Sequence, residues 1–173
     1  MSDTFITIIA IALAAILMFI FPLMTMSDRT DDVSQLTVDT ATTDFVDKIR
    51  TTGKITQQDY DQFIQTITST GNTYNVEMEV RILDENPGKK ATQAATDKIG
   101  ENVYYSIYTS QIDQELQNSG VYKLKEGDIV SVSVKNTNQT LAQQLKNFFY
   151  TVAGNDTYTI AASHGGIVTA TGK

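Results

Sequence analysis

An uncharged apolar run opens the chain and extends from Phe5 through Met26 (FITIIAIALAAILMFIFPLMTM). As an α-helix rising about 1.5 Å per residue it would be roughly 33 Å long, which is enough to cross a hydrocarbon layer of about 30 Å. Ala10 and Ala14, with Ala15 beside them, form a small-xxx-small pattern that favours close helix packing in a bilayer, although alanine is also common in such helices. Pro22 removes one backbone hydrogen bond, so we expect a kink or a loosened last turn there.

A cleaved signal peptide is the competing interpretation of this run. Signal peptides have a basic n-region, an apolar run of about 7 to 15 residues and a cleavage site of small residues. This chain begins Met-Ser-Asp-Thr without Lys or Arg, and its apolar run is longer. We therefore expect a retained membrane anchor.

Two helices are predicted directly after the anchor. Apolar residues recur at helical spacing in DDVSQLTVDTATTDFVDKIRTTG, and Gly53 is a typical residue at a helix end. If this helix stays nearly continuous with the anchor, the molecule is a long rod with a head. We expect the acids of the SDRTDD segment to act as helix-start charges rather than as metal ligands. Thr56 and Asp59 resemble a capping box that starts a second, shorter helix, with Gly71 as its stop.

Three segments are predicted as strands. Residues 74–82 alternate strictly between apolar and polar, as a half-buried strand does, and residues 129–134 repeat that pattern with valines. A third strand is expected from about Thr157 through Ile160, with an interruption at Gly165-Gly166 before it resumes at Ile167. A glycine pair in a strand indicates a bulge or a close backbone approach.

The remaining segments are predicted as helices and turns. Residues 84–88 and 125–128 have turn chemistry, and residues 89–101 are expected to form an exposed, mobile loop or a weak helix. A helix ending near Gly120 is expected to carry one apolar stripe, made of Tyr104, Tyr105, Ile107, Tyr108, Ile112 and Leu116. Another helix is expected over residues 140–150, ended by Gly154-Asn155-Asp156 and facing inward with Leu141, Leu145, Phe148 and Phe149.

Together these elements follow the order ααβαβαβ. They predict an α+β fold in which a long N-terminal transmembrane helix continues into an amphipathic helix, with a small head of about three strands packed on helices. We divide the chain into a transmembrane helix over residues 1–26, an amphipathic helical stalk with the second helix over 27–71, and an α+β head over 72–173.

Composition narrows the classes of function. The chain has 173 residues, the length of one domain, and its 13 Lys and Arg against 20 Asp and Glu leave a net charge of −7. Nucleic-acid binding is not expected, because it depends on clustered cations and Lys89-Lys90 is the only basic doublet. The absence of cysteine excludes disulfides, thiolate zinc sites and cysteine nucleophiles.

No catalytic motif stands out along the chain. His164 is the sole histidine, so a His-based metal site or proton relay would have to recruit distant carboxylates. The acidic pairs Asp84-Glu85 and Asp31-Asp32 are typical of a solvated face. We therefore expect no enzyme activity, no catalytic residue, no cofactor and no metal site, and we expect His164 to be structural or merely exposed. A membrane-anchored hydrolase remains a third possibility without residue support.

The orientation in the membrane is predicted from opposing signals. Arg29, on the C-terminal side of the run, would by the positive-inside rule place the C-terminus in the cytoplasm. It lies among several acids, however, and long domains cross membranes largely regardless of charge. The body also lacks cysteine, so we expect a single-pass protein with an extracytoplasmic C-terminal domain.

The layout resembles type IV pilin-like and Tad-type pilus proteins. The segments FVDKIRTTGKITQQDYDQFIQTITSTGNTYNVEMEV, GDIVSVSVKN with TLAQQL, and the closing GGIV are similar to single-span TadE-like proteins of Gram-positive bacteria that accompany pilus or DNA-transfer machinery. The chain departs from pilins in lacking a short basic leader, a processing site and a glutamate within the apolar helix, which leaves peptidase processing and glutamate-guided assembly without support.

The resemblance implies a structural subunit of a bacterial surface filament that assembles through its hydrophobic N-terminal helix. Its partners would be the membrane, further copies of the chain, and pilus or secretion assembly proteins. The alternative is a monomeric, membrane-tethered accessory or binding protein of a secretion or conjugation complex. The expected helix-packing interface comprises small and large apolar residues of the anchor: Phe5, Ala10, Leu13, Ala14, Ala15 and Leu17.

Overall fold

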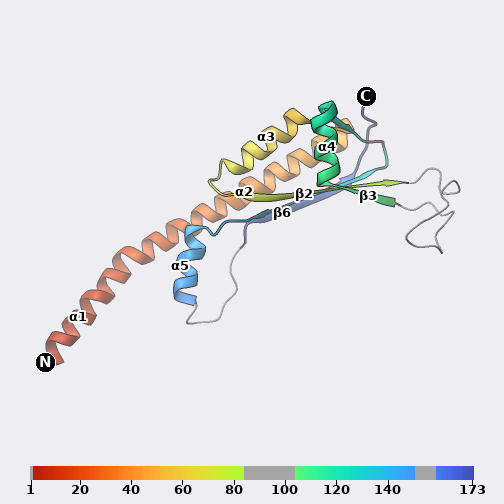
Figure 1. Cartoon of the computed structure of the whole chain (residues 1–173). Helices are drawn as coiled ribbons and strands as arrows, with labels where there is room; N and C mark the ends of the chain where they lie inside the picture. The colour runs from red at the N-terminus through yellow and green to blue at the C-terminus, as the bar shows by residue number, and fades with distance from the viewer. Residues whose placement is uncertain (1, 84–103, 151–158) are drawn as a thin grey trace, which may run out of the picture.

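A long helical rod joins a small mixed head in the computed structural model of the chain (Figure 1), which describes residues 2–83, 104–150 and 159–173, with the backbone alone at residues 2, 145, 146 and 148–150. The rod consists of α1 (Ser2–Ala15), a π-helical turn η1 (Ile16–Ile20) and α2 (Phe21–Thr52). Its N-terminal part projects away from the head, whereas the C-terminal part of α2 lies against the sheet. One continuous helical body therefore connects the apolar run to the core.

The π turn precedes Pro22 directly. The backbone N–H of Phe21 donates to the carbonyl of Ile16, five residues earlier, and Pro22 stands in the first turn of α2. Proline lacks an N–H, and local π adjustments are one way in which a membrane helix re-satisfies its freed carbonyls. The rod therefore continues past Pro22 in helical conformation.

No helix begins at the acidic segment. Asp28, Asp31 and Asp32 lie inside α2, so the expectation that they are helix-start charges is wrong. The helix passes through them because its register continues from the apolar part, and Asp31 is buried against the head instead of facing solvent at a helix end. The predicted end of α2 is confirmed: Gly53 has φ 66° and donates its N–H to the Ile49 carbonyl.

The second helix is confirmed with its cap. After the short strand β1 (Lys54–Thr56), α3 (Gln57–Thr68) begins where the Thr56 hydroxyl accepts the N–H of Asp59 at 3.1 Å. The helix packs against α2, with the rings of Phe45 and Phe63 stacked 4.5 Å apart. Gly71, with φ 82°, lies in the turn that follows.

The described strands form two antiparallel sheets. The main sheet has the order β3-β2-β5-β6, and its members are β2 (Tyr74–Leu83), β3 (Tyr104–Tyr108), β5 (Ile129–Asn136) and β6 (Ala161–Ile167). A small second sheet pairs β1 with β4 (Val121–Lys123). The α+β class is confirmed, and the main sheet has four strands where about three were expected. The predicted strands at residues 74–82 and 129–134 are both present, as is the turn between Lys125 and Asp128.

Two strand assignments from the sequence need correction. Residues 104–108 form a strand rather than the start of a helix, because they pair with β2 in a register that sets Ile107 opposite Val80. The helix α4 (Thr109–Ser119) begins only after them and ends, as predicted, at Gly120. The third predicted strand is continuous through Gly165-Gly166, since both glycines pair with β5 and no interruption occurs there.

Helix α5 (Leu141–Tyr150) confirms the predicted last helix, but Leu141 does not face inward, since its side chain is 53% exposed. The expected inward positions of Leu145, Phe148 and Phe149 lie outside the described side chains. The expected turn at residues 84–88, the loop over 89–101, the strand start near Thr157 and the Gly154 stop lie outside the described residues.

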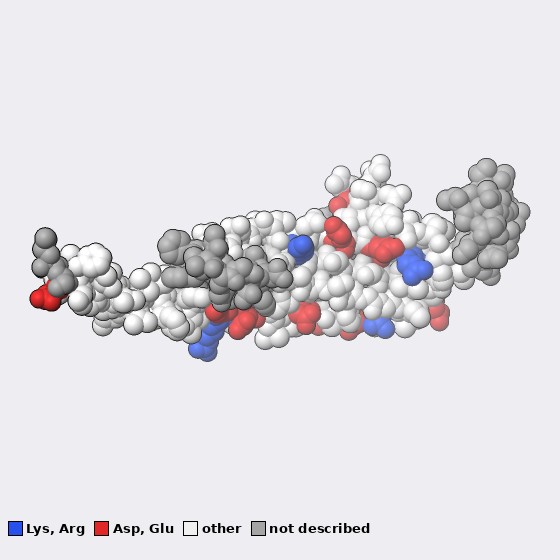
Figure 2. All heavy atoms as spheres, turned by 90° about the horizontal axis from the view of Figure 1, so that it is seen from below, with Lys and Arg blue, Asp and Glu red and all other residues white. Residues whose placement is uncertain are grey.

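Side chains from the rod, the other helices and one face of the sheet form the core. Apolar positions of β2 and β5 alternate onto that face, where α2 covers β5 and β6 while α4 covers β2 and β3. The largest fully buried side chains include Ile49, Ile55, Ile67, Met78, Ile112, Leu116, Leu124 and Ile160. The opposite face of the sheet is seen in Figure 2, where acidic and basic groups are scattered among uncharged side chains. The head is thus a helix layer on one side of an open sheet.

We predict that Gly53→Ala destabilises the fold far more than Gly120→Ala. Both glycines have positive φ, which costs an L-residue about 1–2 kcal/mol. A Cβ at Gly53 would also lie 2.1 Å from the carbonyl oxygen of Ala170, whereas one at Gly120 meets nothing within 4 Å. Denaturant unfolding of the full-length chain in detergent should show a loss of about 3 kcal/mol or more for Gly53→Ala. Equal losses in the two variants would contradict the close approach of the C-terminal segment to Gly53.

We predict an acid-sensitive link between α2 and α3. Burial alone would raise the pKa of Asp59, but hydrogen bonds from Lys48 and Thr56, together with the charges of Lys48 and Lys54, hold it below its ordinary value. The link, 2.6 Å from Lys48 Nζ to Asp59 Oδ1, therefore stabilises the fold above the ordinary carboxyl pKa and is lost as pH falls through the lowered one.

Asp59→Asn should lower the melting temperature at neutral pH, and its difference from the parent chain should shrink below about pH 4. Asp61→Asn, which changes an exposed carboxylate of the same helix, serves as the control and should leave the acid profile nearly unchanged. A constant difference between Asp59→Asn and the parent chain across this range would contradict the prediction.

Candidate functional site

The apolar part of the rod is the largest feature that the head does not cover. Among the described residues it belongs to the one helix that is long and apolar enough to cross a membrane, and none of its most apolar window is buried within the molecule. Phe5, Leu13 and Leu17 are all more than half exposed. Figure 2 shows this part as a stretch without charge between the acidic tip of the molecule and the neck, which is the place where the rod enters the head. In water such a surface would be unfavourable, because removing apolar surface from water lowers the free energy.

Two polar side chains within this stretch form hydrogen bonds to the backbone of their own helix. Thr7 Oγ1 donates to the carbonyl of Asp3 at 2.8 Å, and Thr25 Oγ1 donates to that of Phe21 at 3.0 Å. A hydroxyl that bonds to its own helix needs no water partner. The two threonines are therefore compatible with apolar surroundings.

The six residues expected at a helix interface all lie on the uncovered part of the rod, but they do not share one side. Successive residues are about 100° apart around a helix, so Ala10, Ala14 and Leu13 lie on one side. Phe5 and Ala15 are each about 140° from Ala10 around the axis. The interface stays a prediction. Two helices would approach each other most closely at Ala10 and Ala14, which are small residues on the same side.

Buried polar groups mark the neck, where the rod enters the head. Asp31 Oδ2 accepts a hydrogen bond from Thr140 Oγ1 at 2.6 Å, and both residues are buried. Thr140 in turn caps α5, because its hydroxyl accepts the N–H of Gln143 while the Gln143 side chain accepts the N–H of Thr140. This chain of bonds ties the start of α5 to the rod. It could not be predicted from local sequence patterns, because Asp31 and Thr140 are 109 residues apart.

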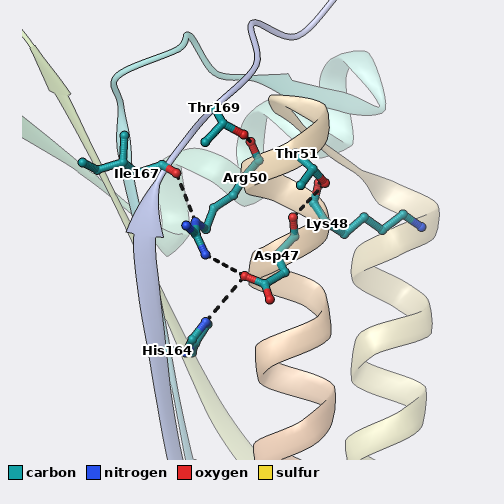
Figure 3. A network of polar contacts seen from close by, with 7 residues as sticks. All are labelled: Asp47, Lys48, Arg50, Thr51, His164, Ile167 and Thr169. Carbon is teal, nitrogen blue, oxygen red and sulfur yellow. Dashed lines mark hydrogen bonds and ion pairs between the residues drawn. The ribbon is translucent and has the colours of Figure 1, made fainter.

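His164 belongs to a contact between α2 and the edge strand β6 (Figure 3). Its Nε2 lies 3.6 Å from Asp47 Oδ1, which also accepts a hydrogen bond from Arg50 at 2.7 Å. Arg50 Nε donates to the Ile167 carbonyl at 3.0 Å, and a Cβ on Gly166 would lie 2.7 Å from that same nitrogen. The predicted close backbone approach is present at Gly165, where a Cβ would lie 2.9 Å from the carbonyl oxygen of Val130, whereas the close neighbour of Gly166 is the Arg50 side chain.

A second side chain of α2 covers the other end of the same edge. Gln35 donates to the Ala161 carbonyl at 2.7 Å and accepts the Ala161 N–H at 3.0 Å, as a neighbouring strand would. With Arg50 at the opposite end, the rod occupies backbone groups that an edge strand otherwise leaves open. The geometry therefore assigns His164 and its neighbours to holding β6, and within the described residues no three His, Asp or Glu side chains are grouped as a metal site would require.

Other titratable groups of the head are shifted by burial. Burial, followed by the charge of Asp128, raises the pKa of Tyr122 to about 12, and burial raises the pKa of Asp113. Burial also raises the pKa of Tyr60, and the negative charges of Asp113 and Asp61 raise it further. These phenols stay neutral at physiological pH, because burial and the neighbouring carboxylates both oppose loss of the proton, so they are core groups with polar ends.

No family model, curated protein or solved structure matches the chain.

We predict that Arg50 and His164 contribute unequally to the stability of the head. Arg50→Ala removes a charge-assisted bond to the Ile167 carbonyl and should lower the free energy of unfolding by about 1.5–3 kcal/mol. His164→Ala removes a partly exposed contact at 3.6 Å and should cost less than about 1 kcal/mol. Chemical unfolding of the full-length chain in detergent measures both losses. A larger loss in His164→Ala would show that the histidine, not the arginine, holds the edge.

Proposed function

We propose that the chain is a pilin-like structural subunit of a bacterial surface filament of the Tad or type IV pilus kind, and that it assembles through its hydrophobic N-terminal helix. The observation that carries this proposal is the uncovered apolar rod, which continues without a break into the core of the head. The resemblance of the layout to TadE-like proteins is in keeping with it.

The proposed assembly exchanges one apolar environment for another. In the membrane the rod contacts lipid, and in the filament the same surface contacts neighbouring rods. The stretch between Asp3 and Asp28 has no charged residue, so packing rods together buries no unpaired charge. Ala10 and Ala14 allow two backbones to approach closely, which is how helices associate where lipid provides no hydrophobic drive.

The rod and the head would move as one unit during assembly. Helix α2 is uncovered near its start and supplies Val38, Phe45, Val46 and Ile49 to the core near its end. A subunit built this way carries its head outward when its rod is packed. We further propose that the head is extracytoplasmic, which places it on the cell surface when the chain polymerises, and that the machinery acting on it consists of pilus or secretion assembly proteins.

A pair of alanine variants tests the proposal. Ala14→Phe should abolish filaments in sheared cell-surface material examined by electron microscopy, because the ring separates two closely packed backbones. Ala12→Phe is the matched control, since Ala12 lies about 160° from Ala10 around the helix, on the side of Phe5 and Ala15, and should disturb filaments less than Ala14→Phe if the close approach is on the side of Ala10 and Ala14.

The wild-type chain decides between the two classes of function in the same assay. Filaments that contain the chain support a structural subunit. A wild-type chain that stays wholly in the membrane fraction overturns the filament proposal and favours the monomeric accessory protein. Filaments that form unchanged from Ala14→Phe would show that this side of the helix is not the interface.

A further inference from the structure

Helix α5 lies beside the rod at the neck. It follows β5 after a short connection, its backbone contacts α2, and Figure 1 shows it running from the neck obliquely to the rod, away from the sheet, with its end on the side of the N-terminal half of the rod. The helix therefore points away from the main sheet and toward the level of the apolar run.

The start of α5 is fixed at a known level on the rod. The buried bond from Thr140 to Asp31 joins the residue before α5 to a residue five positions beyond Met26, the end of the apolar run. At about 1.5 Å per residue, this level is roughly 7.5 Å from the end of the run. The reciprocal cap between Thr140 and Gln143 keeps the first turn in place.

The length of α5 is sufficient to reach the apolar run. Its 10 residues extend about 15 Å along the helix axis. Any inclination to the rod below about 60° therefore brings its last turn to the level of Met26 or beyond. A chain inserted by its apolar run would then have the end of α5 at the boundary between headgroups and acyl chains.

The sequence of α5 suits that boundary. The helix reads LAQQLKNFFY, so its last turn contains Phe148, Phe149 and Tyr150. Tyrosine is enriched at membrane–water interfaces, where its polar end is solvated, and phenylalanine is typical of the apolar face of helices that lie in the interface. Arg29, exposed on the rod three residues after Met26, adds a cation near the same level.

We propose that the last turn of α5 inserts into the interfacial layer of the lipid bilayer as a second membrane contact beside the rod. This inference rests on the proposed membrane insertion of the rod. The two contacts together fix the tilt of the rod and the orientation of the head relative to the bilayer before any assembly takes place. Lipid is the partner because the contact forms in a single inserted chain, without a second copy.

The chain has no tryptophan, so single Trp variants report one position each. Phe148→Trp, Phe149→Trp and Tyr150→Trp together sample all sides of the last turn, since successive residues are about 100° apart. Each full-length variant is reconstituted into phosphatidylcholine vesicles, with and without lipid brominated close to the headgroup. Phe21→Trp on the apolar rod is the control for insertion, and Tyr108→Trp, exposed on β3 at the far end of the head, is the control for solvent.

We expect brominated lipid to quench at least one of the three α5 variants by roughly half or more of the quenching of Phe21→Trp, with a blue-shifted emission, and to leave Tyr108→Trp unquenched. If Phe21→Trp is quenched and none of the three is, the contact of α5 with lipid is overturned while the membrane anchor stands. A blue shift without quenching would place the turn against protein and also overturn it. If Phe21→Trp itself is not quenched, the proposed insertion fails, and the inference fails with it.

Discussion

The structure depends on one helix having two different environments. Near its end α2 is the central element of the head and contributes the buried side chains against which the sheet and α3 pack. Near its start the same helix, with η1 and α1, has no part of the described chain to cover it. Burial of apolar area drives both halves, but only one half finds its partner within the molecule. The other half leaves its apolar area outside the described fold, which is why we propose a membrane and neighbouring rods as its partners.

The neck is where these two environments meet, and polar groups mark it. Three polar residues are buried there, namely Ser27, Asp31 and Ser34, although most side chains of the apolar run that ends at Met26 are exposed. The buried side chain of Asp31 has a hydrogen-bond partner there, because its Oδ2 accepts a short bond from Thr140. The bond also fixes where α5 starts, so that a single polar contact sets the position of the last helix relative to the rod.

Local signals in the sequence were sufficient for several long elements and for the ends of some helices. Strict alternation identified β2, and Gly53 and the Thr56 cap placed the ends of two helices correctly. The strand β3 was missed because its tyrosines and Ile107 merge with Ile112 and Leu116 into a stripe that also fits a helix. Only pairing with β2 decides between the two, and that pairing is not local.

Contacts between residues far apart in the chain also explain what the sequence could not reveal about the candidate site. It showed the apolar run plainly, yet not whether the run is covered, since covering is a property of the whole fold. His164 and the glycine pair were visible as unusual residues. Their partners were not, because Asp47, which His164 contacts, and Arg50, which lies against Gly166, are both more than a hundred residues earlier in the chain.

The way in which β6 is held has a mechanical consequence. The strand lies along α2, with Gln35 at one end and Arg50 at the other, and it is hydrogen-bonded to β5 over its whole length. Tension applied along the molecule is thus shared by many bonds at once and cannot open them one after another. The strand is therefore held along its length rather than at a single point.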